Sequence, residues 1–382
     1  MRTGPDRHID FKMFFIAGKC CIQGLSPYNM AQYFRIYNDN YHFLPDPLVG
    51  FSYPPAALLY CIPLGFLSMG AALRVFDGLN LLACLALFGS SYYWWKGRKG
   101  NKALPVAAWA WLAFSLTLFP VIGTIFTSQT GLFAVAGAML AIVACRFDRP
   151  FVIVAGIVMA SSKPQLTAPV LLFLFLFQKK NRRAINAALA LVALSGILMV
   201  IGNPAPLDSA VLTFRQYTRA SVNYETNMYG LAALLRYWGA GQVLTHIVTA
   251  AVFFLIFTFV VYALRRRLSA DPFFDISASP AAIAVLFTLA GVITAIHWYD
   301  LVAFSPAVML AGTRSRGQQL LLSPALLGIW RPGFWRYRLA AFMFSRFHAR
   351  ELDHLWMSGL MLYVLFFYTL FLYRDQKNEN SI

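Results

Sequence analysis

Long apolar segments separated by short basic clusters fill most of this 382-residue chain and limit its fold more than any other feature. Hydrophobic residues make up 59% of the chain and charged residues only 12%, whereas soluble domains carry about 25% charged residues. A soluble fold of this length could not bury so much apolar surface. We therefore predict an all-α fold, a polytopic transmembrane helical bundle with about 10–12 apolar segments. These segments cover residues 54–69, 72–95, 103–121, 131–145, 150–162, 164–178, 184–202, 243–264, 279–296, 300–313 and 355–373.

Lysine and arginine residues follow every second apolar segment between residues 96 and 316. The clusters are Lys96 to Lys102, Arg146 and Arg149, Lys179 to Arg183, Arg265 to Arg267, and Arg314 with Arg316. Cytoplasmic loops of membrane proteins carry an excess of these residues. The clusters therefore predict cytoplasmic loops, and they place residues 122–130, 203–242 and 297–300 on the outer side. The net charge of +17 follows this pattern, so we do not expect the chain to bind nucleic acid.

Three parts are expected along the chain. Residues 1–53 are predicted to form an extracytoplasmic loop with amphipathic helices, and residues 54–316 a transmembrane core with outer loops. Residues 317–382 are predicted to form an amphipathic cytoplasmic segment and a C-terminal transmembrane helix. The outer position of the first part requires residues 54–69 to lie in the interface or to re-enter, since two full crossings before residue 96 would place it in the cytoplasm. The short length and the prolines of residues 54–69 favour an interfacial or re-entrant segment, and so an outer position of residues 1–53.

Asp10 is an acidic residue in the first part, and Tyr28 and Tyr53 follow it. A lone acid near the start of a chain is typically solvated. Tyr53 is followed by Pro54 and Pro55, however, and these aromatic and proline residues predict a rigid pocket edge at the membrane surface. A half-buried carboxylate in such a pocket could act as a general base towards a hydroxyl group.

Lys163 lies between two apolar segments, far from the cytoplasmic basic clusters. It is either a lysine at a helix end that extends to the interface, or a cation that binds a lipid-linked phosphate on the outer side. Gln129 lies in another outer loop, at the predicted start of a helix, where free backbone N–H groups can contact an anion.

His297 and Tyr299 lie at an outer corner between two apolar segments, and Arg215 and Arg219 lie in the outer loop 203–242. The corner is either an interfacial aromatic belt or a place where His297 binds a phosphate or a sugar hydroxyl. The loop is either solvated or suited to a sugar phosphate, because arginine binds phosphate with two hydrogen bonds. All four groups of candidates are predicted on the same side of the membrane.

Motifs for nucleotides and metals are not found. The sequence contains no Walker A motif, no Gly-x-Gly-x-x-Gly and no His-x-x-x-His, and its five cysteines lack metal-ligand spacing. We therefore expect neither a metal nor a cofactor.

Several short motifs occur in an order that resembles glycosyltransferase family 87, membrane enzymes that use polyprenyl-phosphate sugars. The resemblance covers about residues 8–310 and rests on Asp10-Phe11, Gly24 to Tyr28, Tyr53-Pro54-Pro55, the Gln129 loop, Lys163 with Pro169, and His297-x-Tyr299.

The resemblance implies a multi-pass enzyme of the plasma (inner) membrane that acts in the cell envelope. It implies transfer of a hexosyl residue, mannosyl by preference, or of a pentosyl residue from a polyprenyl-phosphate sugar donor to a lipid or glycan acceptor on the outer face, with inversion. Asp10 would be the catalytic base, and Lys163 and His297 would hold the leaving phosphate. The remaining substrate-binding candidates are Gln129, Tyr28, Tyr53, Arg215, Arg219 and Tyr299. The expected partners are therefore the sugar donor, the acceptor and the lipids of the membrane around the protein.

The chain departs from the family at its start, because members have a transmembrane helix before the acidic loop and Met1 lies nine residues before Asp10. We expect either that the first helix of the family is missing or that the start is assigned late. Two other functions stay open. A transporter or flippase of a lipid-linked saccharide would use Lys163 and Arg219, although no inverted repeat is visible. A structural partner in envelope assembly would need no particular polar residue.

Overall fold

The computed structural model describes residues 9–41, 50–99, 106–200, 203–219, 228–267, 279–312, 314–330 and 349–379. Within these ranges the chain forms helices and no strand, apart from one isolated bridge between Tyr229 and Ile296. The predicted all-α polytopic bundle is thereby confirmed.

The helices divide into long spans and shorter apolar pieces. In chain order they are α1 (Ile9–Ile22), α2 (Met30–Tyr41), η1 (Pro55–Ala57), α3 (Leu58–Gly65), α4 (Met69–Lys99), α5 (Val106–Leu116), α6 (Phe119–Phe126), α7 (Gly131–Arg146), α8 (Pro150–Ala160), η2 (Pro164–Leu166), α9 (Ala168–Phe177), α10 (Arg182–Ser195), η3 (Gly196–Met199), α11 (Pro206–Arg219), α12 (Leu231–Tyr237), α13 (Gln242–Arg267), α14 (Pro280–Ile293), η7 (Trp298–Phe304), α15 (Ser305–Ala311), α16 (Arg316–Trp330) and α18 (Ala349–Glu379). In the described part of the chain, five helical stretches are long and apolar enough to cross a membrane: Met69–Trp95, Ala108–Phe126, Arg182–Met199, Gln242–Arg265 and Met357–Arg374.

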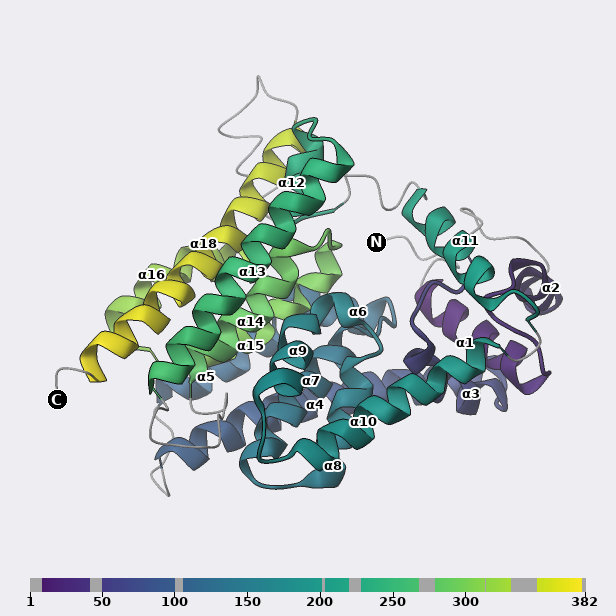
Figure 1. The fold of residues 1–382 in the computed structure, drawn as a ribbon, viewed down its shortest axis with the longest axis horizontal. Coiled ribbons are helices and arrows are strands. Elements are labelled where there is room, and N and C mark those ends of the chain that lie inside the picture. The colour runs from purple at the N-terminus through teal and green to yellow at the C-terminus, as the bar shows by residue number, and fades with distance from the viewer. Residues whose placement is uncertain are drawn as a thin grey trace.

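The short apolar helices α7 and α14 form the centre of the larger of two hydrophobic cores. Thirteen of the 16 residues of α7 are buried, and every residue of α14 from Pro280 to Val292 is buried. Both helices are apolar on all sides, which is the pattern of a helix enclosed by other helices. The long helices α13 and α18 run side by side and both pack on α14 (Figure 1), whereas α4 and α8 pack on α7.

The second core holds the N-terminal helices α1, α2 and α3, which lie together at the end of the molecule far from the C-terminus (Figure 1). Phe11, Phe14 and Phe15 of α1 are fully buried in it. The long stretch α10–η3 connects the two cores, because Ile185 belongs to the first and Met199 packs against the second. The N-terminal helices are thus fixed to the bundle through side-chain packing.

Helix α1 approaches α3 closely at a pair of glycines, Gly18 and Gly65. A Cβ atom at Gly18 would lie 2.1 Å from the carbonyl oxygen of Cys61, and one at Gly65 would lie 2.5 Å from the carbonyl carbon of Gly18. Backbone stands against backbone at this contact, so neither side can move away by changing a rotamer.

We predict that Gly18→Ala separates α1 from α3 and destabilises the N-terminal core by about 1–3 kcal/mol, the usual cost of overpacking. The measurement is hydrogen exchange of the α1 amides in detergent, which should lose protection. Gly78→Ala is the control, because Gly78 lies in α4 with no atom within 4 Å of an added Cβ. Equal protection of α1 in both variants would contradict the prediction.

Candidate functional site

A buried ion pair between Lys163 and Asp300 lies inside this apolar protein. The Lys163 Nζ atom is 2.5 Å from Asp300 Oδ1, and the two side chains are 4% and 5% exposed. Removing two charges from water costs several kcal/mol for each ion, which their attraction offsets only where the geometry is good and further hydrogen bonds are made. The fold therefore keeps two charged groups at this position although burying them costs stability.

Three interruptions of helices bring the polar residues together. Lys163 lies between α8 and η2, where Pro164 holds it in a non-helical conformation with φ −142° and ψ 69°. Asp300 lies in the 3-10 helix η7, and Gln129 lies just before α7, next to Ser128, which has a positive φ of 51°. Since backbone that leaves the helix exposes polar groups, such breaks persist in membrane proteins where they line a site or are buried in protein.

Gln129 connects the ion pair to the N-terminal core. Its Oε1 atom accepts one hydrogen bond from Lys163 Nζ at 3.2 Å and one from the Tyr53 hydroxyl at 3.3 Å. The Gln129 side chain is fully buried. The ring centre of Tyr299 lies 5.2 Å from Lys163 Nζ, and the His297 ring stacks on Tyr299 with 5.1 Å between the ring centres. The structure thus brings together Tyr53, Gln129, Lys163, His297 and Tyr299, all of them candidates from the sequence.

Two acidic residues of this region were not among the sequence candidates. Asp300 is the ion-pair partner of Lys163. Asp77 of α4 accepts a hydrogen bond from the Ser128 hydroxyl at 3.0 Å, which steadies the loop that carries Gln129. An acid within an apolar segment is costly unless it is paired or used, and this signal was present in the sequence for both residues.

Tyr28 supports the polar cluster indirectly, through a hydrogen bond to the backbone of Tyr53. Its side chain is 4% exposed, and its hydroxyl donates to the carbonyl oxygen of Tyr53 at 2.8 Å. Burial raises the pKa of the Tyr28 phenol above its ordinary value, so the phenol keeps the proton that it donates. Tyr28 thereby fixes the backbone of Tyr53, whose own hydroxyl reaches Gln129.

The remaining candidates lie on two helices. Asp10 is the second residue of α1, and its side chain lies outside the described part of the structure. Phe14 follows one turn later, and its ring centre is 4.5 Å from that of Tyr53. Arg215 is exposed on α11, and the side chain of Arg219, the last residue of that helix, is also outside the described part.

The cluster consists of the Lys163–Asp300 ion pair with the polar side chains of Tyr53, Gln129 and His297 around it. Among the described residues, no group of three or more His, Cys, Asp or Glu side chains could hold a metal ion.

We predict that Asp300→Asn destabilises the protein by about 3–5 kcal/mol, because it leaves the Lys163 ammonium buried without its counter-charge. Thermal unfolding in detergent measures the change. The exposed pair of Lys180 with Asp148, at 2.8 Å, supplies the control, since exposed ion pairs contribute little to stability and Asp148→Asn should leave the unfolding temperature close to that of wild type. If the two variants lost the same stability, the buried pair would not have the importance assigned to it.

In a comparison with protein families, the model of glycosyltransferase family 87 matches residues 51–290. Comparisons with curated proteins and with solved structures gave no match. The matched range is more than half of the chain, and it contains Tyr53, Gln129 and Lys163 of the polar cluster. The chain therefore belongs to glycosyltransferase family 87 and is a multi-pass membrane glycosyltransferase.

Proposed function

We propose that this enzyme transfers a sugar from a polyprenyl-phosphate donor to a lipid or glycan acceptor on the outer face of the plasma membrane, with inversion. The sugar is a hexosyl residue, mannosyl by preference, or a pentosyl residue. The observation that supports the proposal most is the buried Lys163–Asp300 pair with Gln129 and Tyr53. Transfer from such a donor releases an anionic phosphate, and this cluster places an ammonium group, oriented by a carboxylate, among polar side chains in an apolar protein.

In this proposal Lys163 stabilises the leaving phosphate. An ammonium group has three donors, and in the structure Lys163 directs donors to Asp300 and Gln129. These two acceptors hold the lysine in place before the substrate arrives. Negative charge grows on the phosphate as the sugar leaves, and a fixed cation at this point stabilises the transition state more than the ground state. His297, beside Tyr299, would contact the same phosphate.

Asp10 is proposed as the general base. It takes the proton of the acceptor hydroxyl while that oxygen bonds to the anomeric carbon. The bond from this carbon to the phosphate oxygen breaks, and the polyprenyl phosphate leaves with the electron pair. The contacts of Phe14 with Tyr53, and of Tyr53 with Gln129, support this role, because Asp10 lies about 6 Å before Phe14 along the axis of α1.

The first test of the proposal uses Asp10→Asn. We expect sugar transfer to fall by at least about 100-fold, the lower end of what a general base contributes. Membranes that contain the full chain are incubated with radiolabelled polyprenyl-phosphate mannose or arabinofuranose, and labelled product is counted. Asp39→Asn is the control, since Asp39 is an exposed acid of the neighbouring helix α2.

Each outcome of this assay decides a separate part of the proposal. Full activity of Asp10→Asn would show that Asp10 is not the general base. Wild-type membranes that form no covalent product with either donor would overturn the donor class. Movement of the labelled lipid without a covalent product would favour a flippase.

The second test separates the structural and functional roles of Lys163. The double variant Lys163→Gln with Asp300→Asn removes both charges, so it should be more stable than Asp300→Asn alone. Transfer should nevertheless stay low, because the leaving phosphate has lost its cation. Thermal unfolding and the transfer assay are measured on the same samples, and normal transfer by the double variant would show that the pair serves only the fold.

A further inference from the structure

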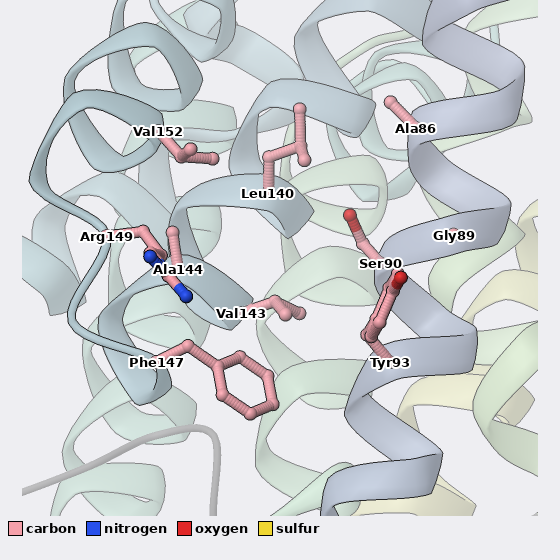
Figure 2. Close-up of a pocket in the computed structure, with 10 residues that line it drawn as sticks. All are labelled: Ala86, Gly89, Ser90, Tyr93, Leu140, Val143, Ala144, Phe147, Arg149 and Val152. Atoms are coloured by element: carbon pink, nitrogen blue, oxygen red, sulfur yellow. The ribbon is translucent and has the colours of Figure 1, made fainter.

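A cleft of about 570 Å³ opens between α4, α7 and α8, away from the ion pair (Figure 2). Its volume is within the range of about 300–1,000 Å³ that is typical of small-molecule sites. Apolar side chains form most of its walls, among them Leu140, Val143 and Val152. The α7 residues that line the cleft belong to the C-terminal half of that helix, whereas Gln129 precedes its start.

The cleft is distant from the proposed active site. Gly131, at the start of α7, is beside the ion pair, because a Cβ there would lie 3.5 Å from Asp300 Oδ1. Ala144, which lines the cleft, is 13 residues further along the same helix, or about 20 Å at 1.5 Å per residue. A ligand in the cleft would therefore not touch the Lys163 cluster.

Gly89 leaves room in the wall of the cleft that α4 forms. No atom lies within 4 Å of the position that its Cβ would occupy. Glycine in a helix interior costs about 1 kcal/mol relative to alanine, and no close helix contact at Gly89 accounts for this cost. The space beside Gly89 is part of the cleft itself.

Two polar groups face each other across this apolar cleft. Figure 2 shows Ser90 on α4 with its hydroxyl directed into the cleft, and Arg149 on the opposite wall. The Ser90 side chain is 4% exposed, and its Oγ atom has no hydrogen-bond partner in the described structure. A buried hydroxyl of this kind is costly unless something pairs with it, so it indicates a ligand with a polar group.

Arg149 has a charge that no described residue of the protein neutralises. The neighbouring Asp148 is held instead by Lys180 at 2.8 Å and by Asn181 at 3.1 Å. Those hydrogen bonds keep the pKa of the Asp148 carboxyl below its usual range. Arg149 is exposed, and it lies in the basic cluster with Arg146 that the charge pattern places on the cytoplasmic side.

We propose that this cleft binds an anionic glycerophospholipid of the cytoplasmic leaflet. One acyl chain lies along the apolar walls beside Gly89, the phosphate pairs with Arg149, and the Ser90 hydroxyl donates to an ester oxygen. The walls require an apolar chain and Arg149 requires an anion. A lipid of the adjacent leaflet has both, and the inner leaflet is rich in anionic lipid.

The experiment measures lipid retained by the purified full chain with native mass spectrometry, after exchange into detergent with phosphatidylglycerol or phosphatidylcholine. One tightly held phosphatidylglycerol is expected. Arg149→Gln should weaken its binding by about fivefold, which corresponds to the ~1 kcal/mol of one cation near an anionic surface. The control is Arg183→Gln, an exposed arginine of another basic cluster, which should change nothing.

A second variant tests the apolar part of the cleft. Gly89→Leu fills the empty space and should remove the bound lipid while thermal stability stays near that of wild type. Gly78→Leu lies on the same helix, also with nothing within 4 Å of its Cβ, and does not line the cleft, so it should retain the lipid. Equal retention of both lipids by wild type, or unchanged binding in Arg149→Gln and Gly89→Leu, would overturn the proposal. The readout is independent of sugar transfer.

Discussion

The buried pair of Lys163 and Asp300 is the interaction on which the arrangement of this protein depends. The two residues are 137 positions apart and each lies where a helix is interrupted. A lone ammonium or a lone carboxylate at this depth would be far more costly than the pair. The helices that carry them must therefore meet in one orientation, and Gln129 in the loop before α7 completes the same contact.

The N-terminal helices become part of this site through aromatic packing rather than through charge. Tyr53 packs on Phe14 and donates to Gln129, while Tyr28 holds the backbone of Tyr53. The contact of Gly18 in α1 with Gly65 in α3 fixes how closely these two helices pack. The position of Asp10 is thus set by packing in the second core, and a change far from any polar residue would displace it.

The sequence predicted the class of fold and most of the clustered residues, but not how they pair. Apolar segments and basic loops indicate a helical membrane protein directly, and the cost of a charge in an apolar segment pointed to Lys163. The same argument applies to Asp300, but its neighbours His297 and Tyr299 at the same corner were selected from the sequence instead. Tyr28 was expected at a pocket edge and is buried behind Tyr53. Pairings over such separations depend on helix packing, which a single sequence does not encode locally.

Helix α7 has charged groups near both ends, and the protein treats them differently. Near its start, Lys163 is compensated inside the protein by Asp300 and Gln129. Near its end, Arg149 has no acidic partner among the described residues, because Asp148 is held by Lys180. An ion in an apolar interior must bring its partner with it, whereas an ion at a membrane surface finds one in water or in lipid headgroups. Lys163 is therefore compensated by the fold itself, whereas Arg149 is exposed and, in the proposed lipid site, takes its partner from the surroundings.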